Sequence, residues 1–165
     1  MRKIGIIAVL SLMALALAAV PAFAGNPHFI KSATNASLSG ANLNVHFKEA
    51  GLPSGAVENV QASATEAVAY ECVNGGNKNP SASNKRTFQT TGSASGFFPA
   101  DQNGNIVGDL TITPKSAADL GFSCPPGQAT TFVSVTYSNV MVKDLTSGAS
   151  IQIAGTFSFR NPSAP

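Results

Sequence analysis

The chain has 165 residues, of which 44% are hydrophobic and only 11% are charged, and its formal net charge is +2. Two of its ten basic residues lie at the extreme N-terminus, and no later basic cluster is larger than Lys85-Arg86. This composition excludes the extended positive surface that nucleic-acid binding requires.

Residues 1–24 have the three parts of a secretory signal peptide. A positively charged start is followed by the uncharged apolar run 4–20, by a proline and by the small-residue site 22–24. We predict cleavage between Ala24 and Gly25. An uncleaved membrane anchor is the alternative, because the apolar run matches the lower limit of about 17 residues for a spanning helix.

The mature chain, residues 25–165, is expected to be a single secreted domain that acts outside the cell. Loss of Arg2 and Lys3 leaves eight basic residues against eight acidic ones, so its net charge is zero. A neutral surface gives little electrostatic attraction to a charged partner. No later segment approaches the length of a membrane span, so we expect no stable membrane insertion after cleavage.

Hydrophobic and polar residues alternate through most of the mature chain, as is typical of antiparallel strands with one buried face. Residues 29–37 are expected to pair with a strand over 42–48 through a turn at Ser39-Gly40. The segment 60–72 has apolar residues in one phase at 60, 62, 64, 68, 70 and 72, which predicts one long strand that ends at a cysteine.

Turn-forming residues predict two hairpins further along the chain. Residues 101–105 separate a strand ending near Phe98 from one that begins at Ile106. Residues 146–148 lead into the final strand, 150–160. Seven or eight short strands with prolines between them predict an all-β antiparallel sandwich, immunoglobulin-like or a related Greek key.

The adjacent residues Phe97 and Phe98 lie at the end of one predicted strand. Neighbouring residues of a strand face opposite ways, so one of these two rings is expected to point away from the core.

The two cysteines, Cys72 and Cys124, form an even pair in an exported chain, which predicts a disulfide. The loop that it closes has about 53 residues, for which the chain-entropy relation gives a stabilisation of about 4 kcal/mol. Neither cysteine has a histidine nearby or a Cys-x-x-Cys spacing, so a metal site or reactive thiol is not indicated. Residues 73–84, rich in Asn, Gly and Ser, predict a long surface loop that begins next to Cys72.

The sequence contains no assembled set of catalytic groups. There is no Gly-x-Ser-x-Gly, no phosphate-binding glycine loop and no His-Glu-x-x-His. We expect His46 to be a solvated side chain beside Asn44 and Lys48.

Glu66 is exceptional among the acids because it lies in phase with the apolar residues of its strand. Buried there, it would have a raised pKa and could act as a general acid. The alternative, which we favour, is a β-bulge over residues 64–67 that turns Glu66 outward.

Asp101, Asn103 and Asn105 have the oxygen spacing that begins a calcium-binding loop. However, Ile106 and Ile112 occupy the places where such a loop needs its glycine and its closing glutamate. We therefore predict a turn and no metal site there, and no cofactor is predicted elsewhere.

The stretches around the two cysteines, YECVNGGN at residues 70–77 and SCPPGQ at residues 123–128, resemble those of a set of small exported proteins of filamentous Gram-positive bacteria. The resemblance covers most of the mature chain and implies no activity, ligand or site. Our leading hypothesis is a non-catalytic extracellular binding or cell-surface module with an unidentified partner. The alternative is a small secreted enzyme, or a protease inhibitor that presents loop 73–84.

Overall fold

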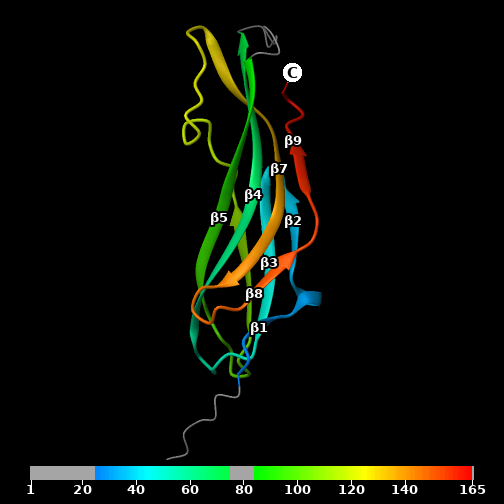
Figure 1. Ribbon diagram of the computed structural model, residues 1–165, viewed down its shortest axis with the longest axis vertical. Helices are drawn as coiled ribbons and strands as arrows, with labels where there is room; N and C mark the ends of the chain where they lie inside the picture. The colour runs from blue at the N-terminus through cyan, green and yellow to red at the C-terminus, as the bar shows by residue number, and fades with distance from the viewer. Residues whose placement is uncertain (1–24, 75–83, 165) are drawn as a thin grey trace, which may run out of the picture.

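The computed structural model describes residues 25–74 and 84–164, which form a long, narrow stack of two β-sheets (Figure 1). The predicted signal peptide, with its cleavage site after Ala24, and residues 75–83 of the predicted loop lie outside the described residues. In chain order the elements are β1 His28–Phe29, the 3-10 turn η1 Lys31–Ala33, β2 Asn35–Ser39, β3 Asn42–Ala50, β4 Val57–Asn74, β5 Lys85–Pro99, β6 Ile106–Ile112, β7 Gln128–Asp144, β8 Ser150–Ile153 and β9 Phe157–Arg160.

Both sheets are antiparallel throughout. In the first sheet β3 is central, with β6 on one side and with β1 and β2 along successive parts of the other. In the second sheet the order is β5-β4-β7, and β8 and β9 pair with successive parts of β7. The predicted all-β antiparallel sandwich is confirmed.

The core lies between the sheets and follows from the alternation in the sequence. Residues in one phase of β3 and β6 face the matching phase of β4 and β7, and the other phase faces water. Removing such side chains from water stabilises the fold by about 1.5–3 kcal/mol each. The aliphatic residues of this core that are fully buried are Leu43, Val45, Val60, Ala62, Val68, Ile112, Val135, Val140 and Val142.

The predicted disulfide is confirmed. It joins Cys72 in β4 to Cys124 in the segment 113–127 between β6 and β7, with the two Cα atoms 5.6 Å apart. The second sheet extends beyond the first at this end of the molecule, and the segment runs along it (Figure 1). Phe122 packs on Tyr70, with ring centroids 6.2 Å apart, so an aromatic contact supports the covalent link.

The turn over residues 101–105 exists, but the hairpin predicted around it is wrong. β5 pairs with β4 in the second sheet, whereas β6 pairs with β3 in the first, so the turn carries the chain between sheets. Turn chemistry determines where the chain reverses, but it does not determine which strand accepts the next row of hydrogen bonds.

The second predicted hairpin, at residues 146–148, is confirmed, since Lys143 of β7 pairs with Ser150 of β8. The final predicted strand is divided into β8 and β9 around Gly155, whose φ is +123°. The first predicted strand is likewise divided, because η1 separates β1 from β2, and β2 pairs with β3 as expected.

Candidate functional site

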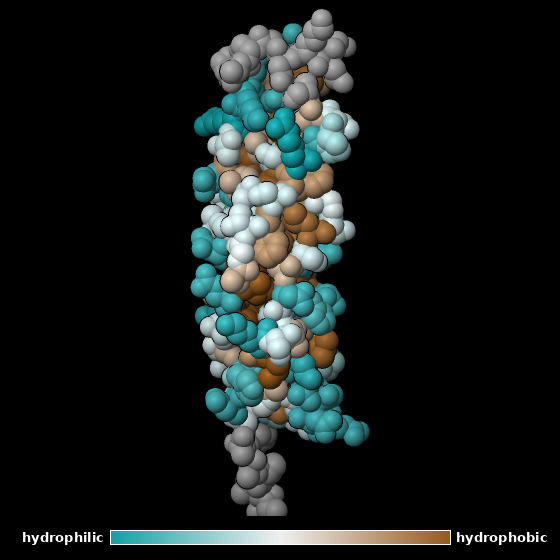
Figure 2. Space-filling model, turned by 90° about the vertical axis from the view of Figure 1, so that its right-hand side faces the viewer, coloured by the Kyte–Doolittle hydropathy of each residue, from teal (hydrophilic) through white to brown (hydrophobic). Residues whose placement is uncertain are grey.

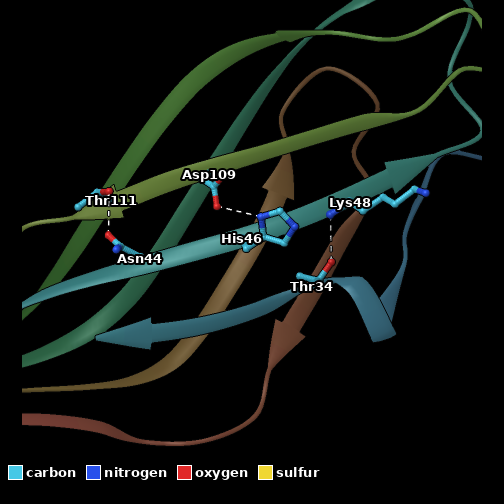
Figure 3. A network of polar contacts seen from close by, with 6 residues as sticks. All are labelled: Thr34, Asn44, His46, Lys48, Asp109 and Thr111. Atoms are coloured by element: carbon cyan, nitrogen blue, oxygen red, sulfur yellow. Dashed lines mark hydrogen bonds and ion pairs between the residues drawn. The ribbon is translucent and has the colours of Figure 1, made fainter. Parts of the chain in front are cut away.

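The outer face of the first sheet carries rows of polar side chains that the strand register brings together. We call it the polar face (Figure 3). Asn35 of β2, His46 of β3 and Asp109 of β6 form one row, and Ser37, Asn44 and Thr111 form the next. Thr111 Oγ1 donates a hydrogen bond to Asn44 Oδ1 over 3.0 Å.

His46 and Asp109 are hydrogen-bonded on this face, with Nδ1 2.8 Å from Oδ1 (Figure 3). The prediction that His46 is exposed to water beside Asn44 and Lys48 agrees with its 38% exposed side chain, but its partner was not foreseen. Asp109 is 63 residues away along the chain, and only the β3–β6 register brings the two side chains together.

The pair does not amount to a catalytic site. In the described part of the chain, His46 makes its one side-chain hydrogen bond to Asp109, and no serine, threonine or cysteine bonds to its ring. Asp109 is 72% exposed, so water screens the pair and its contribution to stability is below about 1 kcal/mol. A buried orienting acid and a bonded nucleophile, which define a catalytic triad, are missing among the described contacts.

A cavity of about 320 Å³ lies beside the polar face, between the edges of the two sheets. We call it the lateral groove. One wall comes from η1, β2 and the residue between them, and the other comes from β8, β9 and the residue after β8. The lining residues are Lys31, Thr34, Asn35, Ala36, Ile151, Gln152, Ile153, Ala154 and Phe157.

The groove exists because the first sheet covers its neighbour only partly. β2 has five residues, and it is the outer strand of its sheet at this edge. The apolar face of β8 and β9 is consequently left half-buried at Ile151, Phe157 and Phe159. Figure 2 shows this side of the molecule, where hydrophobic side chains form a broken stripe along its length between hydrophilic ones.

Glu66 is fully buried, and the favoured prediction that a bulge turns it outward is wrong. A register shift does occur next to it, between Ser63 and Thr65. The extra residue belongs to β7, where Asn139 has a φ of +52°, so the alternation of β4 continues unbroken. The sequence located the irregularity correctly but not the strand that contains it.

The Glu66 carboxyl faces the interior of the sandwich. Its Oε2 accepts a hydrogen bond from the Lys115 backbone N–H over 3.4 Å, while Oε1 has no partner. Burial raises the pKa of Glu66, and the bond from Lys115 partly offsets this effect. His46 lies on the outer face of the first sheet, so no common cleft contains both candidate catalytic residues.

Four further acids are buried, and the sequence reasoning missed them: Glu49, Glu58, Glu71 and Asp144. Glu71 lies next to Cys72 in β4. The other three, which we call the carboxyl cluster, lie in the apolar phase of their strands, as Glu66 does. Glu49 continues the buried phase of β3 after Phe47, and Asp144 continues that of β7 after Val142. Testing every acid against the apolar phase of its strand would have found this carboxyl cluster.

In the predicted turn, the carboxylate of Asp101 accepts hydrogen bonds from the backbone. Asp101 Oδ1 accepts the N–H groups of Asn103 and Asn105, each over 2.8 Å. Across residues 25–74 and 84–164, no three histidine, cysteine or acidic side chains are grouped so as to hold a metal ion. Over the same residues, no helix has the length and hydrophobicity needed to cross a membrane.

The chain matches no protein-family model, and it shows no significant similarity to a curated protein sequence. Among solved structures it is similar to the solution structure of R. palustris CsgH, with a TM-score of 0.20 and 11% sequence identity. The alignment covers 81% of this chain and 91% of that one. A likeness at this level carries no argument about function.

Proposed function

We propose that this chain is a non-catalytic binding or cell-surface module, secreted from the cell, and that the lateral groove is its binding site. The observation that carries the proposal is the half-buried apolar face of β8 and β9 at the open edge of the sandwich. Partly covered apolar surface that lines a cavity is what a ligand site offers.

The lining suits a ligand with both apolar and polar parts. Ile151, Ile153 and Phe157 provide apolar surface, whereas Lys31 and Gln152 add exposed polar side chains. Apolar walls supply affinity and a few polar groups fix orientation. The polar face adjoins the groove, because Asn35 belongs to both.

The secreted location is part of the same proposal. It is supported by the disulfide, which persists in oxidising surroundings, and by the signal-peptide pattern of residues 1–24. An immunoglobulin-like arrangement is also proposed, on the support of two antiparallel sheets packed as a sandwich.

The proposal is tested by capture of ligands from culture medium and on a glycan array. Ala154→Trp places an indole in the groove at an exposed residue, and Ser95→Trp adds the same group at an exposed residue of β5 as a control. We expect the wild type and Ser95→Trp to retain the same ligand and Ala154→Trp to lose it. Equal retention of the ligand by both variants would show that the lateral groove is not the binding site.

A further inference from the structure

The carboxyl cluster joins the two sheets at the end of the sandwich near the β7–β8 turn. Glu49 comes from β3 in the first sheet, and Glu58 and Asp144 come from β4 and β7 in the second. Their exposed fractions are 0%, 5% and 0%. Both glutamates lie within hydrogen-bonding reach of the Asp144 side chain, which is therefore the centre of the cluster.

The surroundings supply fewer hydrogen bonds than three carboxylates need. Glu49 Oε1 accepts a bond from Ser147 Oγ over 3.3 Å, and Asp144 Oδ1 accepts one from the Thr146 N–H over 2.8 Å. The hydroxyl of Thr146 also lies within reach of Glu58. One oxygen of each acid remains buried without a partner: Glu49 Oε2, Glu58 Oε2 and Asp144 Oδ2.

No positive charge compensates the cluster among the described residues. The neighbours of Glu49 on the adjoining strands are Phe29 of β1 and Ile106 of β6, and Glu58 lies opposite Phe98 of β5. Within residues 25–74 and 84–164, no lysine, arginine or histidine lies within ion-pair distance of the three acids. Burying three unpaired negative charges together is strongly unfavourable.

We propose that Glu49 and Glu58 are protonated in the folded protein and donate hydrogen bonds to Asp144, so that the cluster is a proton-dependent latch between the two sheets. Two protons give partners to all three unpaired oxygens. They also reduce the buried charge from three to one, as adjacent carboxyls commonly do by sharing protons.

The latch weakens as the pH rises. Burial, followed by the charge of Asp144, raises the pKa of Glu49 to about 7 and also raises the pKa of Glu58. A carboxyl whose folded pKa is raised contributes its full stabilisation below its unfolded value and loses it as the pH rises through the folded value. The protein should therefore be more stable near pH 5 than near pH 8.

The test compares the wild type with Glu49→Gln, whose amide keeps the side-chain shape and replaces the O–H donor without needing a proton. We expect the stability of Glu49→Gln to change less than that of the wild type between pH 5 and pH 8. The ratio of the unfolding constants of the two proteins should shift by roughly 10- to 100-fold over this range. Asp119→Asn is the matched control, because Asp119 is exposed and hydrogen bonds from Ser116 lower its pKa, so it stays ionised between pH 5 and pH 8 and its replacement should leave the pH dependence of stability unchanged. Glu58→Gln provides a second variant if Glu49→Gln does not fold.

A direct readout is the ¹³C NMR titration of the carboxyl carbons in the folded wild type. Glu49 should titrate near neutral pH, and ionisation of Glu49 and Glu58 below pH 5 would overturn the proposal. If Glu49→Gln and Glu58→Gln both kept the pH dependence of stability of the wild type, the proposal would also be overturned. Recovery of stability at pH 8 on adding calcium chloride, reversed by EDTA and lost in Glu49→Gln, would identify a cation site instead.

Discussion

The carboxyl of Glu66 fills the space beside Gly92 on the neighbouring strand, where a β-carbon on residue 92 would overlap Glu66 Oε1. The same β-carbon would lie 2.8 Å from Ile112 Cγ2 of the opposite sheet. Glycine weakens a strand interior because it has no side chain to pack. Here it makes room for a buried acid between the sheets.

Gly92→Ala should therefore destabilise the fold, even though alanine is normally better than glycine in a strand. We expect a loss of about 1–3 kcal/mol in the free energy of unfolding, because the added methyl group overpacks the core. Chemical denaturation monitored by circular dichroism measures this loss.

Gly96→Ala is the matched control in the same strand. Its β-carbon would lie 3.1 Å from the Phe98 ring, without the overlap found at residue 92, so Gly96→Ala should cost less stability than Gly92→Ala. Combining Gly92→Ala with Glu66→Ala should recover part of the stability, and a double variant no better than Gly92→Ala alone would contradict the steric explanation.

Replacing Glu66 by Gln tests whether its buried carboxyl responds to pH independently of the carboxyl cluster. Burial raises the pKa of Glu66, so the wild type loses stability as the pH rises through that raised value. Glu66→Gln should lose less stability than the wild type as the pH rises, so the stability of the variant relative to the wild type should increase from pH 4 to pH 8. Thermal unfolding across that range measures it, and equal curves for the two proteins would exclude a titrating Glu66.

The strands of this protein could be predicted because their alternation is local. The phase of β3, the long run of β4 and the turn before β8 are all properties of neighbouring residues. Which strands pair, and which side chains meet across them, depends on residues that are distant in the sequence. The contact of His46 with Asp109 and the transfer of β6 to the other sheet both required knowledge of the β3–β6 register.

The error on Glu66 has a different origin. The apolar phase of its strand left two orientations open for Glu66, buried or turned outward by a β-bulge over residues 64–67, and the outward orientation was favoured. The structure keeps the acid inside, supplies one backbone donor and leaves Gly92 as space for it. Glu49 follows Phe47 in the apolar phase of β3, so the comparison that singled out Glu66 applies to Glu49 as well.

The disulfide should contribute strongly to stability. Cys72 and Cys124 are 52 residues apart, and the double variant Cys72→Ala/Cys124→Ala should lose about 4 kcal/mol by the chain-entropy relation. Denaturation with and without a reducing agent measures the effect. The reductant should shift the wild type and leave the double variant unchanged, and a loss below about 1 kcal/mol would mean that the segment 113–127 is held by its other contacts.

Phe97 and Phe98 offer a matched pair on opposite faces of β5. As predicted for one of the two rings, Phe97 points outward and is 74% exposed, whereas Phe98 packs against Phe47 with ring centroids 5.0 Å apart. Phe97→Ser should change stability by no more than about 0.5 kcal/mol, and Phe98→Ala should cost about 3 kcal/mol, because it leaves a cavity beside Phe47. Denaturant titration of both variants checks this, and comparable losses would show that the outer face of the second sheet is covered in solution.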